Sequence, residues 1–197
     1  MEPLGELRDP ARLLGLFSDL NDTLTTEGRP TAEAYAALER LRAAGRLAVA
    51  VTGRPAGWCD HIARMWPVDA MVGEHAAFWI PYETKSRRLV KRYVVCDVER
   101  VRRAEHLLKI GKKILAEVPG CAISSDQAYR EADLAIDFCE DVPALPREAV
   151  GKIVAIMERE GLTTKVSSIH VNGWFGGYDK LSTTRRMLKE DFDIDLD

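Results

Sequence analysis

The sequence lacks the features that mark membrane-spanning, secreted or nucleic-acid-binding chains. None of its apolar runs approaches the ~20 residues that cross a bilayer, and Met1 to Pro10 is too charged for a secretory signal peptide. The formal net charge is −3, without the basic stripe of a nucleic-acid footprint. We therefore expect neither a membrane nor a nucleic acid among its partners.

Cysteine is scarce. Cys59, Cys96, Cys121 and Cys139 are far apart and form no Cys-x-x-Cys pair, so neither a zinc site nor a disulfide framework is indicated. Widely spaced cysteines of this kind are typical of reduced thiols, and we expect a cytoplasmic protein.

What the chain does have is the composition of a globular protein. Of its 197 residues, 46% are hydrophobic and 30% are charged. This length suits one domain of ordinary size or a core that carries an inserted module.

The first 75 or so residues alternate between strand and helix patterns. Apolar strands are predicted at 12–19, 47–51 and 70–73, and helices at 32–44 and from Pro55 to Pro67. Short, wholly apolar strands are expected when both faces of a parallel sheet are covered. This order predicts the start of a doubly wound α/β fold.

The pattern then changes to that of an α+β module. Antiparallel strands are predicted at 78–83 and 88–96, helices at 98–117 and 146–160, and further strands at 121–124, 134–138 and 164–171. A last helix, which Asp179 caps, runs to about residue 190 and returns to the core. We therefore expect an insertion over 80–172 in a core of 1–79 and 173–197.

Three polar positions stand where an α/β sheet presents its chemistry. Asp19 ends the first strand, ahead of a turn that holds Asn21 and Thr23, and Thr52-Gly53 ends the second. Lys180 lies at the start of the last helix, where the macrodipole disfavours a cation and an anion nearby would favour one. Taken singly, each has a plainer explanation as a cap, a turn or a solvated surface residue.

Together these positions resemble the first three motifs of the haloacid dehalogenase (HAD) superfamily. The resemblance implies a Rossmann-like core in which Asp19 is the nucleophile and Thr52 and Gly53 bind a phosphoryl oxygen. Lys180 would offset negative charge, and Mg²⁺ would be bound by Asp19 and the main-chain carbonyl of Asn21.

An α+β insertion between the second and third motifs is similar to the type IIB branch, the sucrose-phosphatase-like and Cof-like enzymes. The strings Thr52-Gly53-Arg54-Pro55, leading to Gly73-Glu74, and 167–174, leading to Tyr178-Asp179-Lys180, resemble that branch too. The resemblance implies a cap that closes over sugar phosphates. Candidates for binding the substrate are Gly53, Arg54, Arg130, Glu131, His170 and Asn172, although a buried, self-satisfied polar cluster would explain the cap residues equally well.

The sequence departs from the family pattern in two ways. Asn21 replaces the Asp that serves as general acid/base, a loss that costs about 10²–10⁴-fold. The family's fourth, acidic motif is not found before Asp197. We therefore expect either a missing C-terminal segment or a second chain to supply a strand beside Leu13–Phe17.

Two functions remain open. One is a Mg²⁺-dependent phosphatase, impaired in this form, that acts on a sugar phosphate or a similar small phosphate ester. The other is a non-catalytic module that binds such an ester on the same fold, which Asn21 favours. A dinucleotide-binding Rossmann domain fits poorly because no Gly-x-Gly-x-x-Gly follows the first strand.

Overall fold

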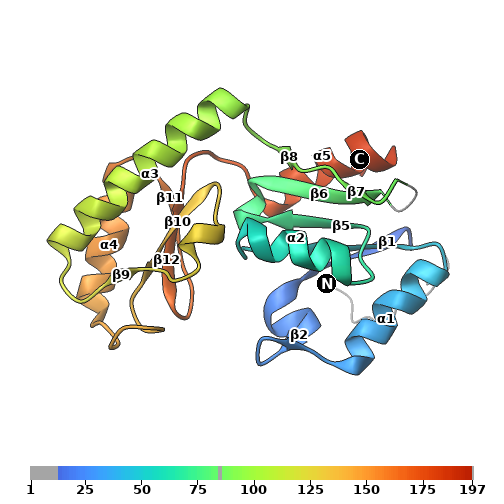
Figure 1. Ribbon diagram of the computed structural model, residues 1–197, viewed down its shortest axis with the longest axis horizontal. Helices are drawn as coiled ribbons and strands as arrows, with labels where there is room; N and C mark the ends of the chain where they lie inside the picture. The colour runs from blue at the N-terminus through green and yellow to red at the C-terminus, as the bar shows by residue number, and fades with distance from the viewer. Residues whose placement is uncertain (1–12, 84–85, 197) are drawn as a thin grey trace.

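The computed structural model describes residues 13–83 and 86–196 and shows two bodies side by side. In Figure 1 the core, with α1, α2 and α5, lies to the right, and the cap, with α3 and α4, lies to the left. The chain passes from core to cap ahead of α3 and returns after β12. An α/β core with an inserted α+β cap is therefore confirmed.

The core sheet combines parallel and antiparallel strands. β1 pairs with β4 and β4 with β5, both in parallel, as the doubly wound pattern predicts. β6 then pairs antiparallel with β5, and the short β7 and β8 pair with β6. The strands are β1 (Gly15–Asp19), β4 (Leu47–Val51), β5 (Ala70–Gly73), β6 (Phe78–Glu83), β7 (Arg88–Leu89) and β8 (Arg92–Tyr93).

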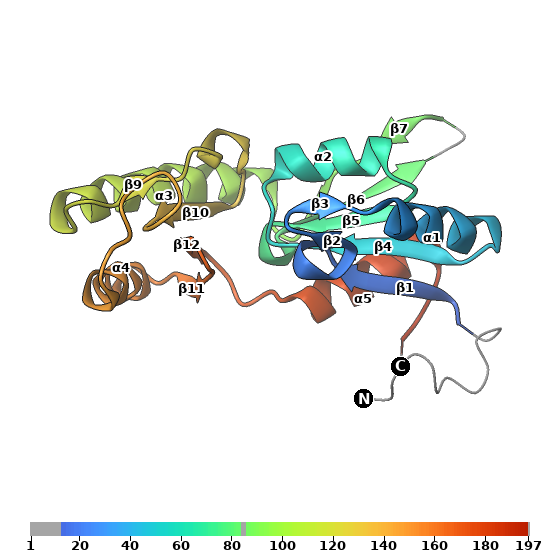
Figure 2. The same ribbon diagram turned by 90° about the horizontal axis from the view of Figure 1, so that it is seen from below.

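Helices cover the two faces of this sheet, and Figure 2 shows α2 and α5 on opposite sides of it. Alternate strand residues point to opposite faces. Ala48, Ala50 and Met71 pack in the cluster of α1 (Ala32–Ala43) and α2 (Ala56–Met65). Val49, Val72 and Trp79 pack in the cluster of α5 (Lys180–Phe192). Burial on both faces explains why these strands are wholly apolar.

The cap has a hydrophobic core of its own. Its four strands follow the order β11-β12-β10-β9, all antiparallel, and α3 and α4 pack against them around Ile136 and Ile153. Its elements are α3 (Asp97–Glu117), β9 (Ala122–Ile123), β10 (Asp133–Asp137), α4 (Arg147–Arg159), β11 (Thr163–Val166) and β12 (His170–Trp174).

The prediction of one strand over 164–171 is wrong, because this stretch is a hairpin. β11 and β12 pair antiparallel around a turn at 167–169. The Ser167 hydroxyl closes the turn: it accepts a hydrogen bond from the His170 amide (2.9 Å) and donates one to the His170 carbonyl (3.0 Å). Ser side chains favour such local bonds over a continuing strand.

The boundary of the cap also differs from the one that the sequence pattern gives. Phe78, Trp79 and Ile80 are fully buried in the two core clusters, on a strand that pairs with β5. The pairing therefore places β6, β7 and β8 in the core sheet, whereas the sequence pattern begins the insertion at residue 80. The predicted contact between 78–83 and 88–96 is present in part, as Tyr82 opposite Leu89 and Glu83 opposite Arg88.

β1 borders the core sheet. Within the described ranges it pairs with β4 alone, and Leu14 and Phe17 are 59% and 37% exposed. Unpaired strand edges recruit other chains. A further strand against β1, from a C-terminal segment or a second chain, stays a prediction.

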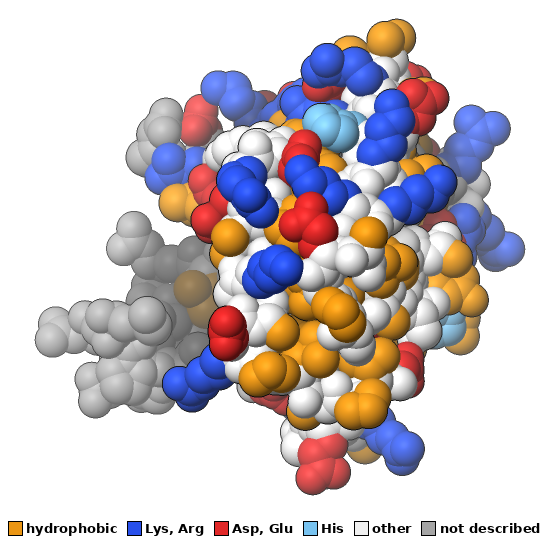
Figure 3. Space-filling view, turned by 90° about the vertical axis from the view of Figure 1, so that its left-hand side faces the viewer, with side chains coloured by type: hydrophobic (Ala, Val, Ile, Leu, Met, Phe, Trp, Pro, Cys, Tyr) orange, Lys and Arg blue, Asp and Glu red, His pale blue; other side chains and the backbone are white. Residues whose placement is uncertain are grey.

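Figure 3 views the cap from its outer end. Basic and acidic side chains are mixed on the upper part of this face, and hydrophobic side chains gather lower down.

In the part of the chain that the structure describes, no helix has the length and apolar character of a membrane span. All four cysteines are free thiols.

The separate cap core generates a first prediction. Ile153 is fully buried in the cap cluster, so Ile153→Ala should lower the free energy of unfolding by about 2–5 kcal/mol, through lost burial and a residual cavity. Urea denaturation followed by circular dichroism measures this loss. Val101→Ala, on an exposed position of α3, is the control and should change stability by less than about 0.5 kcal/mol. Equal effects of the two changes would contradict the packing described.

Candidate functional site

A cleft of about 400 Å³ lies where the carboxyl ends of β1, β4 and β5 face the cap. Its walls come from the loops after these strands, from the start of α5 and from the cap sheet. The residues that line it are Asp19, Asn21, Asp22, Gly28, Gly53, Arg54, His75, Asp126, Arg130, Glu140, Lys165, Ser167, Ser168, Ile169, His170, Asn172 and Lys180.

Asp19 and Lys180 meet at the floor of the cleft as an ion pair, although 161 positions separate them in the chain. Asp19 is the last residue of β1, and its other carboxylate oxygen accepts a hydrogen bond from the Leu20 amide at 2.7 Å. Lys180 is the first residue of α5, directly after the N-cap Asp179. The predicted anion beside this helix-terminal lysine is thus the Asp19 carboxylate.

The side chain of Asn21 points to Arg54. Asn21 belongs to the irregular turn η3 (Leu20–Leu24), which a short hairpin of β2 (Thr25–Thr26) and β3 (Arg29–Pro30) follows. Its amide oxygen accepts a hydrogen bond from Arg54 Nε at 3.1 Å, and its main-chain carbonyl accepts one from the Thr23 hydroxyl at 3.3 Å. Asn21 therefore holds a guanidinium group at the wall of the cleft.

Thr52 and Gly53 form the end of β4. Thr52 is fully buried and does not line the cleft; its hydroxyl accepts a hydrogen bond from the Arg54 amide at 3.1 Å. Gly53 does line the cleft, and a Cβ at this position would lie only 2.8 Å from Cε1 of His75. A glycine is required here because the imidazole occupies the space of any side chain.

A buried ionic cluster forms the cap wall. The Arg130 guanidinium bonds both oxygens of Asp126 at 2.9 Å and both oxygens of Asp133 at 3.0 and 3.1 Å. Asn172 donates to Asp133 at 3.2 Å. Burial lowers the pKa of Arg130, but the two carboxylates outweigh burial and raise it overall. These groups satisfy one another, as the plainer interpretation expects, and Asp126, Arg130 and Asn172 also line the cleft.

His170 and Glu140 extend this wall. Nε2 of the buried His170 lies 2.9 Å from a carboxylate oxygen of Glu140, which the sequence did not single out. Glu131, by contrast, does not line the cleft. Its carboxylate binds Lys91 at 2.6 Å and the Tyr93 hydroxyl, so its side chain joins the cap to the connection that leads to α3.

Sequence reasoning missed His75. Its ring stacks on Trp174 of β12, with centroids 4.4 Å apart and planes inclined by 5°. Burial and then the nearby cations, Lys165 first, lower its pKa to about 3, so the imidazole is neutral at pH 7. Its place two residues after the end of β5, at the same sheet edge as Asp19 and Thr52, was the signal that could have revealed it.

The cleft floor offers oxygen ligands rather than a preformed metal cage. Across residues 13–83 and 86–196, no group of three or more His, Cys, Asp or Glu side chains is placed to hold a metal ion. Lys180 pairs with the Asp19 carboxylate, and Asn21 and Asp22 line the same cleft.

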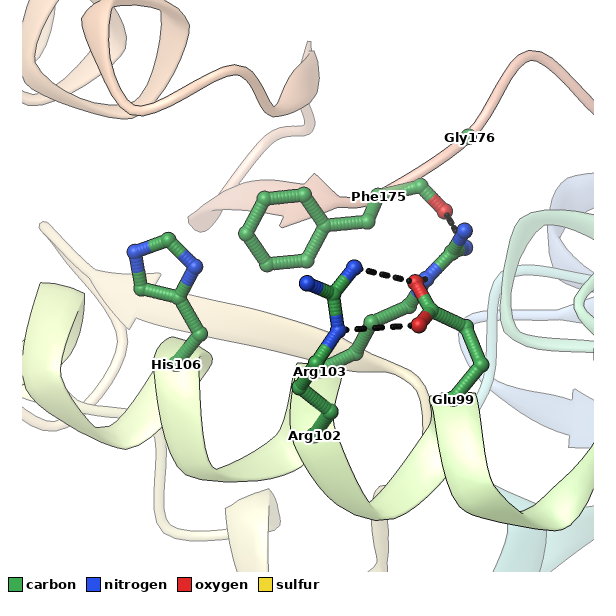
Figure 4. A pocket seen from close by; sticks show the side chains of 6 residues that line it. All are labelled: Glu99, Arg102, Arg103, His106, Phe175 and Gly176. Carbon is green, nitrogen blue, oxygen red and sulfur yellow. Dashed lines mark hydrogen bonds and ion pairs between the residues drawn. The ribbon is translucent and has the colours of Figure 1, made fainter.

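A second hollow, of about 370 Å³, lies outside the cleft against α3 (Figure 4). Glu99 accepts hydrogen bonds from both Arg102 and Arg103, and Arg103 also donates to the Phe175 carbonyl at 2.6 Å. His106 stacks on the Phe175 ring. These contacts fix the segment that leads from β12 towards Lys180.

Comparison with known proteins supports the fold. No family model matches the chain, and no curated protein matches it either. Among solved structures, a Thermoplasma acidophilum protein aligns with a TM-score of 0.72 at 14% identity, over 94% of this chain and 74% of that one.

Two further solved structures carry functional descriptions of their own. A trehalose-6-phosphate phosphatase related protein aligns with a TM-score of 0.58 at 18% identity, over 87% of this chain and 72% of its own. A HAD subclass IIB sugar phosphatase aligns with a TM-score of 0.58 at 12% identity, over 92% and 77%. The chain therefore has the fold of the haloacid dehalogenase superfamily phosphatases.

Proposed function

We propose that this protein hydrolyses phosphate monoesters of small hydroxyl-rich metabolites, sugar phosphates in particular. The observation that carries the proposal is the Asp19–Lys180 ion pair at the floor of a cleft whose opposite wall is polar. A carboxylate beside an ammonium group at the carboxyl edge of a parallel sheet suits nucleophilic attack on an anionic ester. The sugar-phosphatase and trehalose-6-phosphate phosphatase related structures of the same fold support it.

The Asp19 carboxylate would perform the chemistry in two steps. One of its oxygens attacks phosphorus, the bond from phosphorus to the ester oxygen breaks, and the alcohol leaves with a proton taken from solvent water, because the Asn21 amide does not donate one. Water then attacks the aspartyl-phosphate, which releases inorganic phosphate and restores the carboxylate. The Lys180 ammonium would offset the charge of the nucleophile and the phosphoryl group.

A Mg²⁺ ion fits the oxygen donors at the cleft floor. Mg²⁺ is usually held by one or two carboxylates together with water and substrate phosphate oxygens, and Asp19 with the Asn21 carbonyl would be the protein's share. When bound, the ion would neutralise charge on the phosphoryl group.

The cap wall would bind the rest of the substrate. Arg130, Asn172 and His170 present donors, and Asp126 and Glu140 present acceptors, all facing one cleft. Sugar hydroxyls both donate and accept hydrogen bonds, so a mixed wall of this kind suits them. The ionic pairing within the wall would keep these groups in fixed positions.

Asn21 favours a second candidate, a module that binds the ester without turning it over. An amide cannot exchange a proton as a carboxyl group does. Its side-chain oxygen is also engaged, with Arg54 at 3.1 Å. Binding of a sugar phosphate without release of phosphate would favour this candidate over the enzyme.

The nucleophile generates a prediction. Asp19→Asn should abolish both phosphate release and any covalent phosphoenzyme, because an amide is not a nucleophile towards phosphorus. A malachite-green assay and intact-mass spectrometry measure the two effects. Asp60→Asn, on the surface of α2, is the control and should leave both unchanged. A phosphoadduct at full occupancy in Asp19→Asn would place the nucleophile elsewhere.

The amide at position 21 generates another prediction, about the rate of turnover. Asn21→Asp should raise turnover by about 10²-fold or more, since a carboxyl group supplies the missing general acid/base. Steady-state kinetics with a hexose 6-phosphate measure it. Asn21→Ala is the control: its turnover should stay near that of the unsubstituted chain. A gain in Asn21→Asp alone is then due to the carboxyl group and not to loss of the amide. If Asn21→Asp leaves the rate unchanged, proton transfer occurs at another group.

A further inference from the structure

A single buried carboxylate, that of Glu74, binds both bodies of the protein. Glu74 directly follows β5 and is fully buried. One of its oxygens accepts hydrogen bonds from the amides of Ala56 (2.8 Å) and Glu131 (2.9 Å). The other accepts from the amides of Glu131 (3.0 Å) and Ala132 (2.6 Å). Every Glu74 bond named here is to main-chain N–H.

These amides come from opposite sides of the cleft. Ala56 is the first residue of α2, whose N-cap Pro55 makes no side-chain capping bond, so Glu74 supplies the acceptor that this helix end needs. A carboxylate there also complements the helix dipole. Burial and the nearby Asp133 raise the pKa of Glu74 to about 8, whereas the four amide bonds favour its charged form. Glu131 and Ala132 belong to the cap and lie directly between Arg130 and Asp133, the centre of the ionic wall.

The backbone after β5 is strained in a way that serves this contact. Glu74, His75 and Ala76, which form η4 (Glu74–Ala76), have φ values of 43°, 54° and 81°. Non-glycine residues adopt the left-handed region only at an energetic cost, and three of them follow one another here. The turn directs Glu74 to the cap main chain and the His75 ring onto Trp174. These contacts between core and cap offset the backbone strain of the turn.

We propose that Glu74 is a positioning residue that fixes the cap on the core and thereby sets Arg130 above Asp19. A main-chain amide left buried without an acceptor is destabilising, and loss of Glu74 would leave amides unpaired on both sides of the cleft. Among the residues that the structure describes, no other carboxylate accepts main-chain amides from both bodies.

The chain offers a matched control in Asp137. It too is a buried carboxylate, and it accepts hydrogen bonds from the amides of Cys139, Glu140 and Asp141. All three amides lie in the cap. Asp137→Asn, which keeps one acceptor oxygen as Glu74→Gln does, therefore weakens the same kind of interaction without touching the contact between cap and core.

Hydrogen–deuterium exchange of individual amides tests the proposal on the whole chain. In Glu74→Ala the amides of Glu131 and Ala132 should exchange about tenfold faster or more, while those within β4 keep their protection. Glu74→Gln keeps an acceptor oxygen but turns an NH₂ group towards one set of amides, so it should give a smaller change and serves if Glu74→Ala does not fold. Asp137→Asn should accelerate only residues 139–141.

Unchanged exchange at Glu131 and Ala132 in Glu74→Gln and Glu74→Ala would overturn the proposal. So would a uniform acceleration that includes β4, because it would make Glu74 a general stability residue. Neither outcome depends on catalysis.

A kinetic experiment, which rests on the proposed function, tests the same positioning role of Glu74. With Glu74→Gln, kcat/KM for a hexose 6-phosphate should fall about tenfold or more, while kcat/KM for para-nitrophenyl phosphate, which has no sugar for the cap wall, stays within about threefold. An equal fall for both substrates, or for neither, would overturn the positioning role while the phosphatase stands. If the wild-type chain hydrolyses neither ester, the proposed function fails, and the exchange experiment still decides the role of Glu74.

Discussion

Parallel strands of one sheet all end at the same edge, and the cleft of this protein depends on that constraint. Asp19, Thr52 and Glu74 lie at the ends of the three neighbouring strands β1, β4 and β5. Asp19, Gly53 and His75, at or just beyond these strand ends, therefore line one cleft although they are far apart in the chain. The insertion preserves the arrangement, because the chain leaves the core beyond β8 and re-enters it at α5 with Lys180 facing Asp19.

The sequence predicted what strong local patterns encode. The helix expected at 98–117 is found at Asp97–Glu117. It was predictable because its apolar residues recur at helical spacing and because this pattern stops where the helix ends. The resemblance to the haloacid dehalogenase motifs implied that Lys180 would lie near Asp19, and the helix position of Lys180 indicated only that an anion was nearby. The hairpin at 163–174 and the pairing of β6 with the core were not, because a short apolar run does not reveal its partner strand. His75 escaped notice because its role depends on Trp174, almost a hundred positions away.

Charge in the cleft is largely balanced before any ligand arrives. Asp19 pairs with Lys180, Arg130 pairs with two aspartates, and His75 stays neutral because burial and nearby cations lower its pKa. Groups held in this way lose little freedom when a substrate binds, which favours a defined orientation. Asn21 fits the same scheme: as a neutral side chain it accepts a hydrogen bond from Arg54 without adding a charge.

The stack of Trp174 on His75 has an optical consequence. The indole is 6% exposed and lies face to face with a ring from the other body, so it senses whether cap and core remain in contact. If the two bodies separated, water would reach the indole and its emission would move to longer wavelength. The protein thus carries, in its own chain, a fluorophore at the seam between its two halves.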